Sequence, residues 1–498
     1  MMSFEEQAEF QEVTTQAEAG RLKEALAYAN RRLEKDPHDI DGLCLGSYAL
    51  RRLGMGVPAY HYALAAIREV PNNAALWLNL GGAAQILWLP EVAQNAYEQA
   101  IRYATDDKHK ACIWLNLSAL HIDNGDFDEG ERCVRECLKL SPGGRKSATA
   151  NLGICQLARR EWREGWKNYR EVVGGDWCPK VVYNGEPQWN GKAGKTVVVY
   201  EDQGLGDAIS FASVLPDALR DVKVILDCDP RLANLFQRSF PQAKVYGTRR
   251  ETGVSGRLWD KADRLFDASI PLSQLGQFYR NRESDFPGTP YLTPCPIRTT
   301  MWRERFASLG KPVIGIAWSG GVAHTNARYR QLSLNQLLPV FRSIEAHWVC
   351  LQYKDASAEI STFHVEHPDV ELVQYPWATL TKDYDDTAAL IAALDQVLCM
   401  QTAVAHTAGA LGIPVTVLLP KATTWRYGHG DSIPWYHSLR IVRQTHGQWT
   451  DEIERLDLRT LPHSTSRSTS EGQLRGDGGG IRPAHQSAHR ANGSTPCA

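Results

Sequence analysis

Apolar residues recur with a helical period along the first third of the chain, in short runs separated by Gly or Pro. Trp77 and Trp114 each stand two residues before an Asn-Leu pair, and a third such pair begins at Asn151. Pro37 and Pro71 mark a similar interval of 34 residues. Runs spaced by i, i+3 and i+4 predict amphipathic helices. The spacing therefore predicts about four and a half helical hairpins between residues 8 and 172.

The period of about 34 residues and the helix–turn–helix content resemble the tetratricopeptide repeat (TPR). We expect residues 8–172 to form an α-helical solenoid of such repeats, and a generic helical bundle is the alternative. Each repeat of a solenoid contacts mainly its neighbours, and the concave side commonly binds another protein. The resemblance therefore implies a protein partner in the groove of the repeats.

The pattern changes after a linker at 173–194, a segment rich in Gly, Pro and Trp that cannot continue a helix. From there short apolar runs, such as 196–200 and 312–318, alternate with helical segments. Strands that alternate with helices predict parallel α/β sheets covered on both faces. We expect two doubly wound, Rossmann-like halves, at 195–292 and 293–460. Ligands of such sheets bind beyond the carboxyl ends of the strands.

Composition narrows the class of protein. The apolar fraction is 43% and the net charge −2, so nothing indicates a general attraction to nucleic acid or to an anionic membrane. The start of the chain has no secretory signature and no apolar run reaches the length of a membrane span. The 11 scattered cysteines are typical of a reducing compartment. We expect a cytoplasmic protein, with no transmembrane segment. Residues 461–498 contain almost no bulky apolar residue and are predicted to be a disordered tail.

A first loop that can carry chemistry follows the predicted strand at 196–200. It contains Gly204, Gly206 and Asp207, directly before a predicted helix. The glycines permit a tight turn and the close approach of a ligand. Asp207 can take a proton from an acceptor hydroxyl. It can equally be a helix N-cap, a position that favours Asp.

A second loop follows Trp318 and Ser319 and ends with Arg328 and Arg330. Small residues followed by two arginines can close over a diphosphate, since Arg makes bidentate contacts with phosphate. An exposed loop with solvated charges is the alternative.

A third motif joins a predicted strand at 394–400 to a helix that begins near Thr402. Ala403 and His406 lie in the first turns of that helix. Unpaired N–H groups and positive partial charge make a helix start suitable for phosphate. Lys354, just after another strand, is expected at the same edge of the sheet. A lone His on a helix is otherwise more often a core or surface residue.

Metal ligation has weak support. Asp227 and Asp229 form an acid-x-acid pair that binds metal–diphosphate in some glycosyltransferases, but Asp is also common in turns. No histidine pair has zinc spacing. We therefore expect no metal site.

The three loops, in this order, resemble the ADP-heptose:lipopolysaccharide heptosyltransferase family, which has the GT-B fold, and above all its members with tetratricopeptide repeats. O-GlcNAc transferase also places repeats before a GT-B domain. The segments that carry the resemblance are Gln203–Asp207, Gly315–Gly320, Arg328–Leu332, Asp386–Leu394, Thr402–His406 and Pro434–Tyr436.

The resemblance implies an inverting, metal-independent glycosyltransferase that uses a nucleotide-sugar as substrate and needs no other cofactor. The acceptor would be a protein or a glycan. Asp207 would be the general base, with Gly204 and Gly206 shaping its loop. The donor would be bound by Trp318, Ser319, Arg330, Lys354, Thr402, Ala403 and His406.

One departure bears on activity. The family usually carries Asp directly before the Thr of the third motif, and this chain has Gln401. Glutamine keeps hydrogen bonding but loses the negative charge. An alternative reading is therefore a non-catalytic interaction scaffold, in which the repeats bind partners and the transferase domain is degenerate.

Overall fold

The computed structural model describes residues 4–141, 146–174, 178, 180–181, 183–249, 259, 263, 265–321, 327–445, 447 and 449–458. The tail predicted at 461–498 lies outside the described residues. The helical repeats and the α/β part belong to one compact unit, Met1–His463. No described helix combines the length and the apolar character that crossing a bilayer requires.

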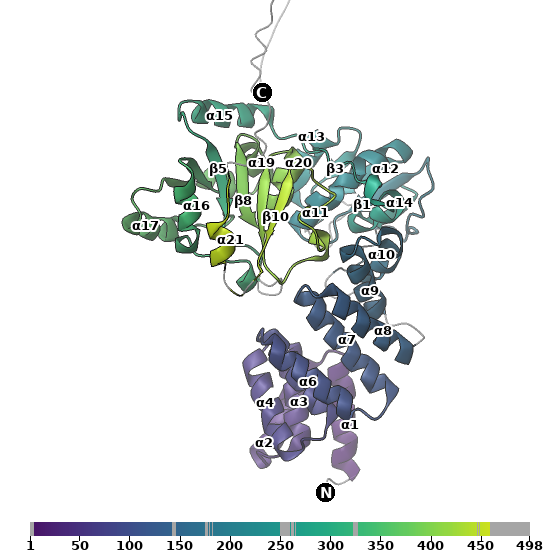
Figure 1. Cartoon of the computed structure of the whole chain (residues 1–498). Helices are drawn as coiled ribbons and strands as arrows, with labels where there is room; N and C mark the ends of the chain where they lie inside the picture. The colour runs from purple at the N-terminus through teal and green to yellow at the C-terminus, as the bar shows by residue number, and fades with distance from the viewer. Residues whose placement is uncertain are drawn as a thin grey trace, which may run out of the picture. The chain divides into compact units, whose positions relative to one another are not determined.

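TPR-like helical repeats form the first part of the chain (Figure 1). The helices of the described residues pair as α1 with α2, α3 with α4, and so on to α9 with α10, where the sequence spacing predicted about four and a half pairs. The difference arises because α1 begins at Phe4. The bounds are α1 Phe4–Glu18, α2 Leu22–Lys35, α3 Ile40–Arg52, α4 Gly56–Glu69, α5 Ala74–Ile86, α6 Pro90–Tyr103, α7 Asp107–Asp123, α8 Phe127–Leu140, α9 Lys146–Ala158 and α10 Trp162–Tyr169.

The turn inside each hairpin contains one residue with positive φ. Gly20, Gly54 and Gly125 take this position in three of the hairpins, with φ of 97°, 76° and 76°. Trp88 and Arg160 take it in the other two, with φ of 57° and 64°. A left-handed conformation costs a residue with a side chain about 1–2 kcal/mol. These two side chains therefore need compensating contacts.

Both side chains contact the α/β part. The Trp88 ring lies edge-on to the Tyr329 ring, with centroids 5.7 Å apart. The Arg160 guanidinium pairs with Glu283 at 2.5 Å and donates to the Ser432 carbonyl oxygen at 2.9 Å. Both strained turns thus carry contacts to the α/β part of the chain.

Helix α10 packs directly into the α/β core. The Trp166 indole N–H donates to the Arg280 carbonyl oxygen at 2.8 Å. The rings of Trp166 and Tyr169 lie 5.6 and 5.4 Å from the Trp425 ring, centroid to centroid. All three aromatic residues belong to the main hydrophobic core. The last repeat is therefore continuous with the core of the α/β part.

The first sheet is wholly parallel, with strand order β3-β2-β1-β4. Its strands are β1 Thr196–Tyr200, β2 Lys223–Asp227, β3 Lys244–Tyr246 and β4 Ala268–Pro271, and its helices are α11 Leu205–Phe211, α12 Leu215–Asp221, α13 Ala233–Ser239 and α14 Gly276–Tyr279. The sequence pattern missed β4, which has only four residues. Residues 208–220 do not form one continuous helix, because a 3₁₀ turn at Ala212–Val214 divides them just before Pro216, which has no N–H to continue a helix.

The second sheet is also parallel, with order β10-β9-β8-β5-β6-β7 (Figure 1). Its strands are β5 Val313–Ala317, β6 His347–Cys350, β7 Leu372–Gln374, β8 Gln396–Met400, β9 Val415–Leu419 and β10 Leu439–Arg443. Its helices are α15 Pro296–Ala307, α16 Leu338–Ser343, α17 Ser357–Glu366, α18 Pro376–Thr379, α19 Tyr384–Ile391, α20 Ala403–Leu411 and α21 Thr450–Glu454.

Successive residues of the central strands face opposite layers of helices. Val313 and Val397 belong to the core that contains α19 and α20 residues. Ile314 and Leu398 belong to the core that contains α16 and α17 residues. Strands buried on both faces are typical of parallel sheets, and they explain the continuous apolar runs in the sequence. The predicted fold class, repeats followed by a Rossmann-like α/β domain, is confirmed.

Candidate functional site

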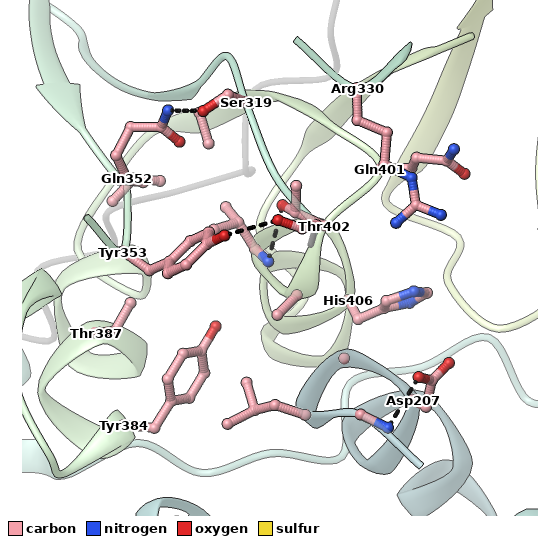
Figure 2. Close-up of a pocket in the computed structure, with 18 of the residues that line it drawn as sticks. Asp207, Ser319, Arg330, Gln352, Tyr353, Tyr384, Thr387, Gln401, Thr402 and His406 are labelled. Atoms are coloured by element: carbon pink, nitrogen blue, oxygen red, sulfur yellow. Dashed lines mark hydrogen bonds between the residues drawn. The ribbon is translucent and has the colours of Figure 1, made fainter. Parts of the chain in front are cut away.

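A cavity of about 550 Å³ lies where several strands of the two sheets end (Figure 2). Its lining segments follow the carboxyl ends of β1, β5, β6, β7, β8 and β9. This is the edge at which parallel α/β sheets bind ligands. The predicted residues that line the cavity are Gly204, Gly206, Asp207, Ser319, Arg330, Gln401, Thr402, Ala403 and His406.

Two predicted donor-binding residues, Trp318 and Lys354, are not among the lining residues. The Trp318 ring is 2% exposed, belongs to the core beneath α16 and α17, and donates to Glu359 at 2.9 Å. It continues the face of Ile314 and Ile316, which points away from the cavity. Lys354 is exposed, with its ammonium 5.3 Å from the centre of the Tyr353 ring. The sequence argument placed both residues near the correct edge of the sheet, but it could not determine which way their side chains point.

The first turns of α11 and α20 approach each other closely, because Gly206 has no side chain. A Cβ built on Gly206 would lie 3.1 Å from Ala403 Cα and 3.4 Å from His406 Cδ2. Such contacts are tighter than packed side chains normally allow. The contact brings a loop of the first sheet against a helix start of the second. Asp207 and His406 thereby come to line the same cavity.

Asp207 has two partners. Its carboxylate accepts a hydrogen bond from the Gly204 backbone N–H at 3.1 Å, which caps α11 from the third helical position. Its other oxygen lies 2.8 Å from Nη1 of Arg426. The side chain is still 35% exposed. The two alternatives for Asp207 therefore coexist, since the residue caps a helix and also lines the cavity.

Arg426 is a lining residue that the sequence argument missed. Its side chain is 4% exposed, and its guanidinium carbon lies 4.3 Å from the Phe211 ring centre and 4.8 Å from that of Trp425. Its Nε and Nη2 have no hydrogen-bond partner among the residues that the structure describes. The sequence signal was an arginine between two aromatic residues just beyond a strand, which is too common to single out.

Arg330 is held at the cavity by its backbone. Gly320 N donates to the Arg330 carbonyl oxygen at 3.1 Å, and Ser319 pairs with Gln331 as a β-bridge. Burial lowers the pKa of the Arg330 guanidinium. Within the described part of the chain, Arg330 Nε has no hydrogen-bond partner and no carboxylate forms an ion pair with the side chain. A buried cation of this kind favours an anionic ligand. The side chain of Arg328 lies outside the described residues.

The start of α20 adds positive partial charge to the same cavity. Thr402 is its N-cap and accepts from the Val404 N–H at 3.3 Å. The helix has nine residues and ends at Gly412, which adopts the left-handed conformation that favours glycine. The predicted helix start is thus in place, since Thr402 and Ala403 both line the cavity, and Figure 2 shows Thr402 there. Its first N–H groups suit a phosphate.

His406 is neutral at physiological pH. Burial, together with the nearby positive charges of Arg426 and Arg330, lowers its pKa to about 3. Its Nδ1 lies 3.3 Å from the Tyr436 hydroxyl, which lies 3.2 Å from the Tyr291 hydroxyl.

The direction of these hydrogen bonds fixes the His406 tautomer. Tyr291 donates its proton to the Ile209 carbonyl oxygen at 2.7 Å. For both remaining contacts to be hydrogen bonds, Tyr436 donates to Tyr291 and His406 donates from Nδ1 to Tyr436. The lone pair is left on Nε2, so this lining residue can accept a hydrogen bond from a ligand hydroxyl.

Gln401 has a structural function that explains its amide. Its Nε2 donates to the Ala422 carbonyl oxygen at 3.0 Å, and its Oε1 accepts from the Thr423 hydroxyl at 3.1 Å and the Thr424 N–H at 3.4 Å. The side chain is 3% exposed. A carboxylate at this position has no proton to donate to Ala422. These hydrogen bonds of Gln401 therefore hold in place the segment that leads to Arg426.

Uncharged polar residues form another part of the cavity. Gln352 donates to the Ser319 hydroxyl at 2.5 Å, and the Tyr353 hydroxyl donates to the Gly321 carbonyl oxygen at 3.0 Å. The hydroxyl of Tyr384 lies 2.9 Å from that of Thr407. Figure 2 shows Ser319, Gln352, Tyr353 and Tyr384 on one side, and Arg330, His406 and Asp207 on the other. The cavity thus joins a part that contains charged side chains to a part with neutral hydrogen-bonding groups.

The acid-x-acid pair is used structurally. Asp227 accepts from the Tyr183 hydroxyl at 2.7 Å and from the Thr248 hydroxyl at 2.8 Å. Asp229 pairs with Arg231 at 2.8 Å. These contacts account for the two carboxylates without a metal ligand role.

Another group of possible metal ligands lies in the repeats. His121, Glu129 and Cys133 have ligand atoms within 4.8 Å of one another. Arg132 already pairs with the Glu129 carboxylate at 2.5 Å, so this group is partly engaged in an ion pair.

Sequence comparison finds a relative that spans both parts of the chain. Protein FlbA from Caulobacter vibrioides is 30% identical over 454 residues, which cover 86% of this chain and 74% of FlbA. An alignment of that length includes the repeats and the α/β domain. No protein-family model matches the chain.

Structure comparison finds similar helical repeats. TTC0263, a TPR protein from Thermus thermophilus, aligns with a TM-score of 0.30 and 19% identity, over 33% of this chain and 89% of its own. PilF from Pseudomonas aeruginosa aligns with a TM-score of 0.30 and 16% identity, over 33% of this chain and 73% of its own.

Proposed function

We propose that this chain, which belongs to the same family as Protein FlbA from Caulobacter vibrioides, is a glycosyltransferase. It transfers a sugar from a nucleoside-diphosphate sugar to an acceptor hydroxyl. Its TPR-like repeats recruit a protein partner or the acceptor itself. The resemblance of its loops to heptosyltransferases supports this reaction class, and the donor sugar can differ from heptose.

One observation carries the proposal. A carboxylate, two arginines whose guanidinium groups have nitrogens without a partner among the described residues, and a helix N-terminus line the same cavity at the carboxyl ends of parallel strands. Asp207 is the carboxylate, and Arg330 and Arg426 are the arginines. Glycosyl transfer needs a base for the acceptor and positive charge for the departing diphosphate. The cavity offers both.

The proposed step is an inverting displacement. The acceptor oxygen attacks the anomeric carbon and forms the new C–O bond, while its proton passes to the Asp207 carboxylate. The bond between the anomeric carbon and the diphosphate oxygen breaks, and its electron pair leaves with the nucleoside diphosphate. Arg330, Arg426 and the N–H groups of α20 stabilise that charge. The residues present supply this positive charge themselves, and the scheme is metal-independent.

Neutral groups of the cavity suit the sugar. His406 offers Nε2 as a hydrogen-bond acceptor, and Tyr353 and Tyr384 offer phenolic hydroxyls. Sugar hydroxyls both donate and accept, so a mixed set of this kind fits them. The position at which the heptosyltransferases usually carry Asp is used differently here, because Gln401 fastens a loop.

A non-catalytic interaction scaffold is the second candidate. The observation that favours it is the engagement of both Asp207 oxygens, one by Gly204 and one by Arg426. In that case the repeats bind partners, and the α/β domain binds a nucleotide or serves as support.

Thermal unfolding with a panel of sugar nucleotides tests the binding part of the proposal. A ligand at 100 times its Kd stabilises the folded protein by about 2.7 kcal/mol, and this raises the melting temperature. We expect one donor to raise the melting temperature. Arg330→Met should lower the affinity for that donor about 10- to 100-fold. Arg342→Met is the matched control, because Arg342 pairs with Asp369 in an exposed ion pair and does not line the cavity.

Release of nucleoside diphosphate and sugar transfer test the catalytic part. With the donor found by the thermal panel, Asp207→Asn should lower the transfer rate about 100-fold or more, while donor binding persists. Asp369→Asn should leave the rate unchanged. Donor binding without transfer to any acceptor favours the scaffold, and equal rates for Asp207→Asn and the wild type exclude Asp207 as the base.

A further inference from the structure

We propose that the diphosphate of the donor replaces Asp207 as the partner of Arg426, so that the carboxylate becomes free for the acceptor only when the donor is in place. This inference rests on the proposed function and deepens it. It makes the Asp207–Arg426 ion pair a switch that orders the two substrates.

The ion pair joins two segments far apart in the sequence. Asp207 stands in the first turn of α11, whereas Arg426 stands in the 3₁₀ turn Trp425–Tyr427 that follows β9. Only Nη1 of Arg426 contacts the carboxylate, at 2.8 Å. A guanidinium has five N–H donors in a fork that matches phosphate, and Nε and Nη2 have no partner in the described part of the chain. A bidentate anion can satisfy more of this fork than Asp207 does.

Exposure decides which partner leaves. Asp207 is 35% exposed and can be hydrated when the pair opens. Arg426 is 4% exposed, so its guanidinium needs another anion in place of the carboxylate. A diphosphate meets that need with more negative charge than a single carboxylate. Replacement of the Asp207 carboxylate by the diphosphate at Arg426 is therefore favourable, whereas opening of the ion pair with no replacement anion is not.

Arg426 is also held rigidly enough to act as a fixed anchor. Its guanidinium lies against the rings of both Phe211 and Trp425. Trp425 is in turn packed by Trp166 and Tyr169 from the last repeat. The arginine therefore stays in place while the Asp207 side chain changes rotamer. Arg330, which also lies near His406, supplies the second positive charge and keeps the cavity attractive to anions.

Isothermal titration with inorganic pyrophosphate tests the exchange of partners. The proteins are the wild type, Asp207→Asn, Arg426→Met, the double variant of these two, and Arg330→Met with and without Asp207→Asn. Asp207→Asn removes the carboxylate that competes with pyrophosphate for Arg426, but it keeps a side chain that can hydrogen-bond. We expect it to bind pyrophosphate about tenfold more tightly than the wild type.

The double-mutant cycle separates the switch from general charge repulsion. The switch predicts that the tenfold gain disappears in the Arg426→Met background and persists in the Arg330→Met background. A gain that persists in Arg426→Met overturns the switch, because repulsion alone would then explain it. No gain in the Asp207→Asn single variant overturns it as well, even where Arg426→Met has lost all binding.

The variants are expected to fold. Methionine keeps an unbranched apolar stem against the two rings, and the Asp207 that loses its ion pair is partly exposed. Thermal unfolding without pyrophosphate checks this for each protein. Pyrophosphate binding with no coupling leaves the proposed function standing and removes only the switch. Absence of pyrophosphate binding in every folded protein contradicts both.

Discussion

The neutral state of His406 leads to a quantitative prediction about pH and stability. The imidazole is buried among Tyr427, Tyr436 and the arginines, and its pKa falls from 6.5 to about 3. In the unfolded chain the same side chain titrates near 6.5. As pH falls through 6.5, the unfolded state therefore binds a proton that the folded state does not. The folded state loses stability progressively between pH 6.5 and pH 3.

The size of the effect follows from the two pKa values. The loss is about 1.4 kcal/mol for each pH unit inside this window. From pH 8 to pH 5 the contribution of His406 therefore amounts to about 2 kcal/mol. His406→Asn removes the titrating ring and keeps a donor near the position of Nδ1, next to the Tyr436 hydroxyl. Every other titrating group is common to the two proteins.

Denaturant unfolding of the wild type and His406→Asn, followed by tryptophan fluorescence and far-UV circular dichroism at several pH values from 8 to 5, measures this term. We expect the stability difference between the two proteins to shift by about 2 kcal/mol, with the wild type losing more. A shift below about 0.5 kcal/mol would refute the reasoning, because the imidazole would then take up its proton equally in both states.

Three further substitutions have expected outcomes. Gln401→Glu replaces the amide donor to Ala422 by a carboxylate, so unfolding experiments should show a loss of about 1–3 kcal/mol, and an unchanged stability would contradict the role given to that amide. Gly206→Ala places a methyl group 3.1 Å from Ala403 Cα, so transfer activity should fall while the protein stays folded, and full activity would mean that the contact between α11 and α20 can widen freely. Trp88→Gly relieves about 1–2 kcal/mol of backbone strain and loses a ring contact worth about 1 kcal/mol, so calorimetry should show a stability change under about 1 kcal/mol.

The elements that the sequence predicted well are those with a strong local pattern. The repeats show a helical period, and strands such as β1 and β8 are continuous apolar runs that stop at a turn. The third motif was predictable in detail, because Thr402 is a typical N-cap and Gly412 a typical helix end. The edge of the sheets at which the cavity lies also followed from the order of strands and helices alone.

The features that sequence reasoning missed depend on side-chain direction or on contacts between distant segments. Trp318 faces the core because it follows the alternation of β5, and one residue of register would have turned it to the cavity. Arg426 meets Asp207 only because Gly206 lets two helices touch and α10 packs Trp425 into the core. The hydrogen bond by which Gln401 holds its neighbouring loop likewise depends on where the fold places Ala422. No local pattern contains these relations.

The structure of the protein with its sugar nucleotide, chosen by the thermal panel, is the most direct test of the account. We expect the diphosphate within hydrogen-bond distance of Arg330, Arg426 and the first N–H groups of α20, with the Asp207 carboxylate separated from Arg426 and facing the anomeric carbon. A nucleotide bound elsewhere, or a diphosphate that contacts neither arginine, would contradict the account.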